Sequence, residues 1–168
     1  MKIFTTLLLL VAVLQISAQQ NIADARTYNE GATITVSGIV TNGSELGGIR
    51  YLQDATAGLA VYDTKLASVE RGDSITVTGE INSYNNLFEI TKTSSFTIHS
   101  SGNQSPASKI IHIDEIGEDF EAQLIEIKNI EIEGAGGSFA GNKNYNFSDG
   151  TNTGVLRIGS ASPIVGQV

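Results

Sequence analysis

The clearest pattern in the chain is a strict alternation of apolar and hydroxyl side chains in two short segments. Residues 33–40 and 74–81 both alternate with period two, are rich in β-branched residues and carry one glycine inside the run. Such alternation predicts half-buried β-strands. A glycine inside a strand is typical of a bulge or sharp bend, which allows a small sheet to curl into a barrel.

Further short strands are predicted between and after these two segments. Apolar runs with few helical features cover residues 49–53, 59–62, 87–91 and 96–99. A tight turn is predicted at residues 54–58, because Asp favours local backbone hydrogen bonds and Gly allows positive φ. Frequent turn signals and the near absence of helical periodicity predict an all-β chain whose first part is a small five-stranded Greek-key barrel.

The pattern then starts again in the second half of the chain. Residues 124–130 are predicted to form a strand in the place of residues 34–40. Residues 147–158 and 52–61 share one pattern. An apolar residue is followed by Asp two positions later and by Thr two positions after that, and then by a short spacer, a Gly and an apolar strand. A repeated strand–turn–strand unit indicates two homologous barrels. The alternative is chance agreement, since turns favour these residues in any case.

These observations give a domain organisation. Residues 21–101 are expected to form the first barrel, residues 102–108 a polar linker, and residues 109–168 a second module. The fourth and fifth strands of the second copy have no counterpart before Val168. We therefore expect a truncated module in a fragment of a longer polypeptide, with downstream domains of that polypeptide as partners. The alternative is that the remainder of the module pairs in some unusual way.

The N-terminal residues show the three-part pattern of a secretory signal peptide. Lys2 gives a positive start, residues 7–14 are an unbroken apolar run, and residues 15–18 suit cleavage after Ala18. The run is shorter than the roughly 20 apolar residues of a membrane-spanning helix. We expect residues 1–18 to be removed and the protein to be secreted or held at the cell surface or in the periplasm, without a membrane span. A buried N-terminal strand or helix is the alternative.

The amino-acid composition excludes several kinds of chemical site and bears on nucleic-acid binding. Cysteine is absent, which excludes disulfides, thiol nucleophiles and zinc sites built on thiolates. The formal net charge of −8 counts against avid, non-specific nucleic-acid binding, because an acidic surface repels phosphate at long range. Such a charge still leaves room for a local basic groove.

No residue pattern indicates catalysis or a cofactor. His99 and His112 are the only histidines, and each stands beside isoleucine as a strand residue does. The carboxylates within residues 114–121 could attract calcium, but their spacing matches no EF-hand and a solvated acidic turn is favoured. We expect a non-enzymatic module without a metal or cofactor.

The motifs together resemble a known family. Residues 36–42 (VSGIVTN), 51–62 (YLQDATAGLAVY) and 72–79 (GDSITVTG) are similar to OB-fold modules of secreted bacterial proteins. Such modules resemble the nucleic-acid-binding OB domains attached to extracellular nucleases, and they also occur in large multidomain surface proteins of Gram-negative bacteria. The resemblance implies an OB-like barrel over residues 22–100 and, more loosely, over residues 109–168.

An OB-like barrel implies a ligand face. OB barrels bind on the face of strands 2 and 3, bordered by the loops between strands 1 and 2 and strands 4 and 5. Strand parity predicts that Leu52, Leu59 and Val61 point inward. The candidate ligand-binding residues that follow from this placement are Tyr51, Gln53, Tyr62, Tyr84, Phe88, Asn42, Arg50 and Lys92, with Arg50 and Lys92 as the nearest phosphate partners.

Three functions remain open for this face. Aromatic rings there could stack the bases of a single-stranded nucleic acid and serve a nuclease further along the chain. The same tyrosines could stack sugar rings of a glycan or surface polymer. In the third alternative the tyrosines pack against a neighbouring barrel, and the chain is a structural spacer.

Overall fold

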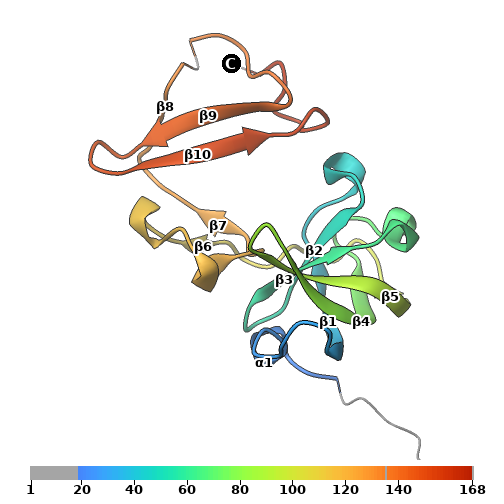
Figure 1. The fold of residues 1–168 in the computed structure, drawn as a ribbon. Coiled ribbons are helices and arrows are strands. Elements are labelled where there is room, and N and C mark those ends of the chain that lie inside the picture. Colours follow the sequence, from blue (N-terminus) through green and yellow to red (C-terminus); the bar gives the residue numbers. More distant parts are fainter. Residues whose placement is uncertain (1–18, 135, 168) are drawn as a thin grey trace, which may run out of the picture.

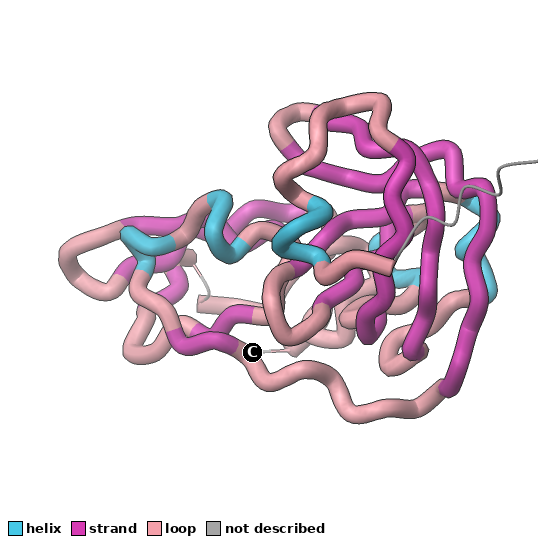
Figure 2. Tube along the Cα trace, turned by 90° about the horizontal axis from the view of Figure 1, so that it is seen from below, coloured by secondary structure: helices cyan, strands magenta, loops and turns pink. Residues whose placement is uncertain are grey.

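The computed structural model describes residues 19–134 and 136–167 of the 168-residue chain. The predicted signal peptide lies outside the described residues. Strands dominate the described part, and helices are limited to single turns (Figure 2). Within these two ranges, no helix is long and apolar enough to cross a membrane.

Five strands close into a barrel in the order β1-β2-β3-β5-β4 (Figure 1). Neighbouring strands are antiparallel except for β3 and β5, which pair in parallel. The predicted all-β fold with a small five-stranded OB-like barrel is thereby confirmed. The strands are β1 (Thr33–Val40), β2 (Ile49–Gln53), β3 (Gly58–Tyr62), β4 (Ser74–Tyr84) and β5 (Leu87–Ser100).

Alternate side chains of each strand fill the barrel. In β1, Ile34 and Val36 are buried, whereas Thr35 lies outside and its hydroxyl hydrogen-bonds to that of Thr78 on β4. The predicted inward orientation of Leu52, Leu59 and Val61 is confirmed, since all three are fully buried. The apolar core consists of Ile22, Ala25, Ile34, Val36, Val40, Leu52, Ala57, Leu59, Val61, Leu66, Val69, Ile75, Val77, Ile81 and Ile90.

The mid-strand glycine of β4 marks a bulge, as predicted. The pairing of β4 with β5 shifts register between Thr78 and Glu80, on either side of Gly79. A Cβ atom at Gly79 would lie 2.7 Å from Thr91 O, closer than real Cβ contacts allow. The predicted strand residues 87–91 and 96–99 both lie in β5, which runs through the residues between them. Lys92, with φ of 47°, bends β5 and lets it continue around the barrel.

A short helix, α1 (Ile22–Ala25), packs against one end of the barrel (Figure 1). Asp54, in the β2–β3 turn, holds this helix in place. Its carboxylate accepts hydrogen bonds from the backbone N–H groups of Ile22 (2.8 Å), Thr56 (2.7 Å) and Ala57 (2.9 Å). Burial raises the pKa of Asp54, but the hydrogen bonds from Thr56, Ile22 and Ala57 outweigh it, so the pKa falls below its ordinary value of 3.8.

Two smaller sheets follow the barrel. Strands β6 (Lys109–Ile110) and β7 (Ile125–Glu126) pair in parallel. An antiparallel sheet has the order β10-β9-β8 and lies above the barrel in the view of Figure 1. Its strands are β8 (Glu131–Ile132), β9 (Lys143–Ser148) and β10 (Thr153–Ile158). The single-turn 3-10 helices of the chain are η1 (Ser44–Leu46), η2 (Thr64–Ser68), η3 (Ile113–Glu115) and η4 (Glu118–Phe120).

The β9–β10 hairpin has a small apolar cluster of its own. Tyr145, Phe147 and Ile158 are buried on one face of the hairpin. The ring of Phe139, from the preceding loop, meets the edge of Tyr145 with 5.1 Å between ring centroids. This sheet is therefore covered on one face by its own chain.

Several backbone contacts of the barrel recur in the second half. Gln20 N–H donates to Thr35 O, and Ile111 N–H donates to Glu126 O with the same spacing between donor and acceptor. The β1–β2 register, which pairs Val40 with Leu52, recurs between β8 and β9, where Ile132 pairs with Phe147. The β2–β3 and β9–β10 turns also match, because Asp54 and Asp149 each accept from the N–H groups two and three residues later.

Two details of the predicted repeat are wrong. Residues 124–130 do not form one strand, because Asn129 adopts a φ of 55° and separates β7 from β8. Gly154 is not the counterpart of Gly58. Gly58 pairs with Gln53 across its turn, whereas Thr153 occupies that position opposite Ser148 in the second hairpin. The domain bounds at 21–101 and 109–168 stay predictions.

Asp54→Ala is expected to lower the free energy of unfolding by about 1–3 kcal/mol at pH 7, because buried N–H groups lose their acceptor. Urea denaturation monitored by circular dichroism measures it. Because the pKa of Asp54 is lower in the folded state than in the unfolded state, its carboxylate stabilises the fold at pH values above the unfolded-state pKa. The difference between wild type and variant should therefore be complete well above pH 3.8 and shrink as the pH falls below it. Asp149→Ala, in the matching but exposed turn, is the control; equal losses for both variants would contradict the role of the Asp54–Ile22 bond.

Candidate functional site

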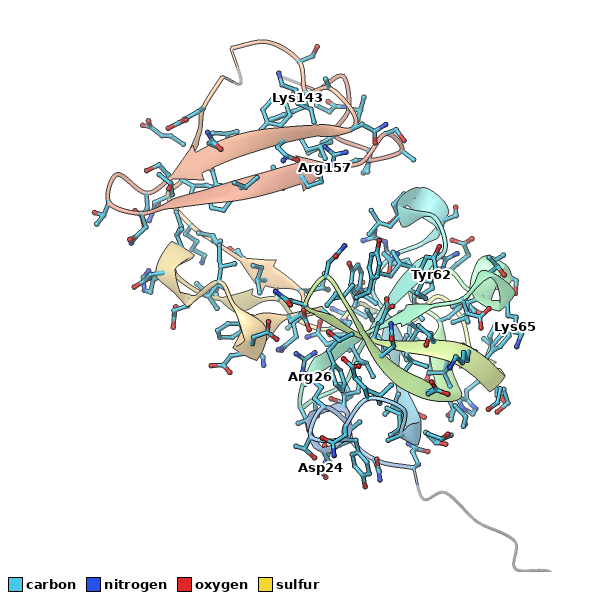
Figure 3. All side chains as sticks on the ribbon, viewed as in Figure 1. Asp24, Arg26, Tyr62, Lys65, Lys143 and Arg157 are labelled. Carbon is cyan, nitrogen blue, oxygen red and sulfur yellow. The ribbon has the colours of Figure 1, made fainter. Side chains whose placement is uncertain are left out.

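The outer surface of β2 and β3 is where an OB barrel binds ligands. In β2, Ile49, Tyr51 and Gln53 point outward, on the side opposite the buried Leu52. Tyr62, at the end of β3, pairs with Ile49 and extends the same surface (Figure 3). The β1–β2 loop with η1 borders this surface on one side, and the β4–β5 turn borders it on the other.

A cavity of about 550 Å³ lies between these two borders, and we call it the barrel groove. Two exposed tyrosines line it: Tyr62 has 55% of its surface exposed, and Tyr84 has 65%. Tyr84 is positioned by a two-residue hairpin, in which Asn85 and Asn86 have φ values of 51° and 67°. Positive φ at both positions defines the turn type that tight hairpins favour. The remaining residues of the barrel groove are Leu46, Ile49, Leu87 and Glu89.

The other end of the same surface is covered by residues 117–124, which we call the docked segment. Arg26, which follows α1, binds this segment through an ion pair with Glu121 (2.9 Å) and a longer one with Glu118 (3.5 Å). The Glu121 carboxylate also accepts from the Phe88 N–H at 3.3 Å. The Arg26 guanidinium lies 5.4 Å from the centroid of the Phe88 ring, a favourable cation–π distance.

Two residues of the β2–β3 hairpin receive the docked segment. The Gln53 side-chain oxygen accepts a hydrogen bond from Leu124 N–H at 2.8 Å. Gly58 lies directly beneath the Ala122 carbonyl, and a Cβ atom at position 58 would collide with that carbonyl. Ala122 itself has a φ of 61°. The sequence therefore needs glycine at position 58 because two backbones approach each other there.

A second cavity of about 500 Å³ adjoins the barrel groove, and we call it the junction cleft. It shares Leu46 and Leu87 with the barrel groove, so the two cavities have a common wall. Its lining comes from the β1–β2 loop, the docked segment and the end of β10. The junction cleft is lined by Thr41, Asn42, Glu45, Leu46, Tyr51, Arg71, Leu87, Glu121, Ala122, Gln123, Leu124, Arg157, Gly159, Ser162 and Pro163.

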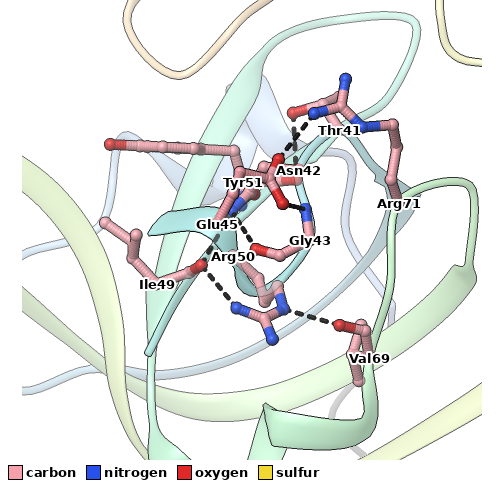
Figure 4. A network of polar contacts seen from close by, with 9 residues as sticks. All are labelled: Thr41, Asn42, Gly43, Glu45, Ile49, Arg50, Tyr51, Val69 and Arg71. Atoms are coloured by element: carbon pink, nitrogen blue, oxygen red, sulfur yellow. Dashed lines mark hydrogen bonds and ion pairs between the residues drawn. The ribbon is translucent and has the colours of Figure 1, made fainter. Parts of the chain in front are cut away.

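Arg50 does not have its predicted role. Its side chain points into the barrel and is only 1% exposed (Figure 4). Its guanidinium donates to the carbonyl oxygens of Val69 (2.7 Å), Gly47 (2.8 Å) and Ile49 (2.9 Å). Arg50 shares the inward parity of Leu52, and these carbonyls satisfy its charge. The prediction that Arg50 contacts phosphate is therefore wrong.

Asn42 likewise has a structural position in the network of Figure 4. It donates to Ile49 O at 2.9 Å and accepts from Tyr51 N–H at 2.6 Å, so it fixes the β1–β2 loop against β2. Glu45 closes the same loop, accepting from Gly43 N–H and from Arg71 (2.6 Å). Burial raises the pKa of Glu45, but the Gly43 N–H and Arg71 outweigh burial, and the net pKa is lowered.

The other predicted residues divide between the two cavities and positions away from both. Tyr62 and Tyr84 line the barrel groove, and Tyr51 lines the junction cleft beside it. Gln53 is buried under the docked segment, and Phe88 packs against Arg26. Lys92 is exposed, pairs with Glu80 at 2.6 Å and lines neither cavity.

Some lining residues were not predicted from the sequence. Leu46 and Leu87 form the wall between the two cavities, and Arg71 and Arg157 bring positive charge to the junction cleft. Arg71 lies three residues before the predicted strand at 74–81, and Arg157 lies in the repeated hairpin. Only the register that the structure shows places Arg157 at the position of the outward-facing Tyr62.

Three acidic side chains within residues 114–121 bind other parts of the protein. Glu115 accepts from His112 N–H at 2.7 Å and so closes the η3 turn. Glu118 and Glu121 bind Arg26. The other histidine, His99, lies on the outer surface of the barrel, where its Nε2 hydrogen-bonds to the Thr76 hydroxyl.

Comparison with known proteins gives a partial match. No protein-family model matches the chain. The chain is 32% identical over 123 residues to Endonuclease YhcR of Bacillus subtilis (strain 168), a match that covers 63% of this chain and 10% of the endonuclease. The chain thus spans about a tenth of the length of that relative. A solved structure, that of the hypothetical protein ygiW from E. coli, covers 48% of this chain with a TM-score of 0.41 and 16% identity, and this chain covers 89% of it.

The closed five-stranded barrel and the partial match to an endonuclease fit an OB-like module. The topology defines the class of fold, and the match connects the sequence to one part of a much larger protein. The whole activity of that larger protein does not follow for this chain, because most of its length has no counterpart here.

Gly58→Ala is expected to displace the docked segment, because the added Cβ collides with the Ala122 carbonyl. The Leu124 N–H, which donates to Gln53, should then exchange its hydrogen at least about tenfold faster, as 1.4 kcal/mol corresponds to a factor of ten. Gly48→Ala is the matched control, since a Cβ there meets only ordinary contacts at 3.5 Å. Unchanged exchange at Leu124 in Gly58→Ala would contradict the docking described here.

Proposed function

We propose that this chain is an OB-like binding module of an exported protein and that it binds single-stranded nucleic acid along the barrel groove. The observation that carries the proposal is the pair of exposed tyrosines, Tyr62 and Tyr84, that line one groove where the β1–β2 loop and the β4–β5 turn converge. The similarity to part of an endonuclease supports the same ligand class.

The barrel groove suits bases better than it suits a phosphate backbone. Its walls are the rings of Tyr62 and Tyr84 and the aliphatic side chains of Leu46, Ile49 and Leu87. Stacking of a base on an aromatic side chain is worth about 1–3 kcal/mol and depends little on the base, because every base has a π-face. We therefore infer binding with little sequence preference.

Charge limits the strength of this binding. The net charge of −8 repels a polyanion, and Glu89 lies at the barrel groove with 5% of its surface exposed. Arg71 and Arg157 lie in the adjoining junction cleft. We infer affinity in the range of about 10⁻⁶–10⁻⁴ M, the range of non-specific binding at physiological salt.

The module would then supply binding for a nuclease elsewhere in a longer polypeptide, and the partial similarity to an endonuclease supports this role. The predicted signal peptide at residues 1–18 supports export of such a protein. Glycan binding is the second candidate, because the acidic surface and the tyrosines suit neutral sugar rings better than phosphates.

Tyr62→Ala and Tyr84→Ala should each weaken binding of a labelled 12-nucleotide single-stranded DNA by about tenfold, because each variant removes one stacking platform. Fluorescence anisotropy at low and at physiological salt measures the affinity. Tyr28→Ala is the matched control, since Tyr28 is exposed near α1 and lines neither cavity.

The wild-type protein should bind more weakly as salt increases, because phosphate contacts release counterions. Absence of binding at low salt, where attraction is least screened, would contradict the proposal. A parallel titration with neutral oligosaccharides identifies the second candidate, for which salt should have little effect.

A further inference from the structure

The junction cleft exists only because two parts of the chain meet. The barrel contributes Tyr51 and the β1–β2 loop, the docked segment contributes residues 121–124, and the end of β10 contributes Arg157. Its volume of about 500 Å³ lies in the range of small-ligand sites, roughly 300–1,000 Å³. Gly159 lies close to the β1–β2 loop, since a Cβ there would be 3.7 Å from Glu45 O, so this part of the chain reaches the barrel.

Tyr51 gives the junction cleft an aromatic surface. Its ring lies on the outer side of β2, two residues from Ile49 of the barrel groove. Burial, the largest cause, and the nearby carboxylates of Glu121 and Glu89 raise the pKa of Tyr51 above its ordinary value of 10.0. The phenol is therefore neutral at physiological pH and presents an uncharged ring.

Gln123 lines the junction cleft and carries a buried side-chain acceptor. Its amide nitrogen donates to Asp119 O at 2.7 Å, which fixes the orientation of the side chain. Its oxygen, Oε1, is buried and has no hydrogen-bond partner among the residues that the structure describes. A buried acceptor without a partner is costly and rare, and it is satisfied when a ligand or a water supplies a donor.

Two guanidinium groups line the same cleft. Arg157 donates through Nη1 to Asn142 O (2.8 Å) and to Asn144 Oδ1 (3.2 Å), and Arg71 donates through Nη2 to Glu45. A guanidinium carries five N–H donors, so these bonds use only part of the capacity of each group. The planar fork of arginine matches phosphate oxygens in a bidentate geometry.

We propose that the junction cleft is a nucleotide subsite that continues the barrel groove, an inference that rests on the function proposed above. The base lies against Tyr51, beside Gln123. The adjoining phosphate binds Arg71 and Arg157. Because the two cavities adjoin at Leu46 and Leu87, a single nucleic-acid strand can extend from Tyr84 and Tyr62 to Tyr51. The binding site is then incomplete without the second half of the chain.

Arg157→Gln tests this subsite in the full chain. The probe is the same 12-nucleotide DNA, titrated at several salt concentrations. Loss of one phosphate contact should weaken binding by about tenfold at low salt and reduce the slope of log affinity against log salt by about 0.7. Lys143→Gln is the matched control. It removes the same charge from the same hairpin but on the opposite face, because Lys143 pairs with Ile158 and Arg157 pairs with Asn144.

Combining Arg157→Gln with Gly58→Ala tests whether the docked segment helps to form the junction cleft. If the docked segment forms the cleft, Arg157→Gln should have little further effect once Gly58→Ala has displaced that segment. Equal losses in Arg157→Gln and Lys143→Gln would overturn the proposal, because long-range charge alone would explain them. Unchanged binding in Arg157→Gln would also overturn it.

These outcomes separate the subsite from the proposed function. If the wild type binds DNA and the variants at Tyr62 and Tyr84 weaken it while Arg157→Gln does not, the barrel groove is the whole site and the subsite is wrong. If the wild type does not bind DNA at all, the proposed function itself fails. Thermal unfolding of each variant shows that the fold is intact.

Discussion

The arrangement of the molecule depends on the contact between residues 117–124 and the β2–β3 hairpin. Gly58 lets two backbones approach, Gln53 accepts the Leu124 N–H, and Arg26 pairs with Glu121. The Arg26–Glu121 pair has side chains that are 17% exposed on both sides, so water screens it less than a surface pair. A charged hydrogen bond of this kind contributes roughly 1.5–3 kcal/mol and a neutral one about 1 kcal/mol. These bonds hold the second half against the barrel where an OB barrel otherwise exposes its ligand face.

This contact divides the outer face of the barrel into two parts. The end near Gly58 and Ala60 is buried under the chain itself, and Ala60 has no exposed surface. The end near Tyr62 and Tyr84 stays open. The open end is therefore the accessible part of this face. Arg71 and Arg157 line the adjoining junction cleft, whereas Arg50 is buried within the barrel.

The barrel was largely predictable because alternation reports burial directly. Ile34 and Val36 point inward as their period requires, and Gly79 forms the expected bulge. Arg50 has the inward parity of Leu52, but its charge suggested a surface position. Sequence alone does not reveal the three carbonyls that satisfy it. The docked segment was unpredictable for a similar reason: the fit of Ala122 over Gly58 depends on a long-range approach of two backbones, which leaves no periodic signal.

We propose that a ligand binds at the open end of the β2–β3 face together with the docked segment. Amide chemical-shift mapping of isotope-labelled protein during addition of single-stranded DNA tests this placement. We expect perturbations at Tyr62, Tyr84 and Leu87, and at the amides of residues 121–124 and Arg157. Perturbations confined to the opposite wall, at Thr35 of β1 and Thr76 of β4, would contradict it.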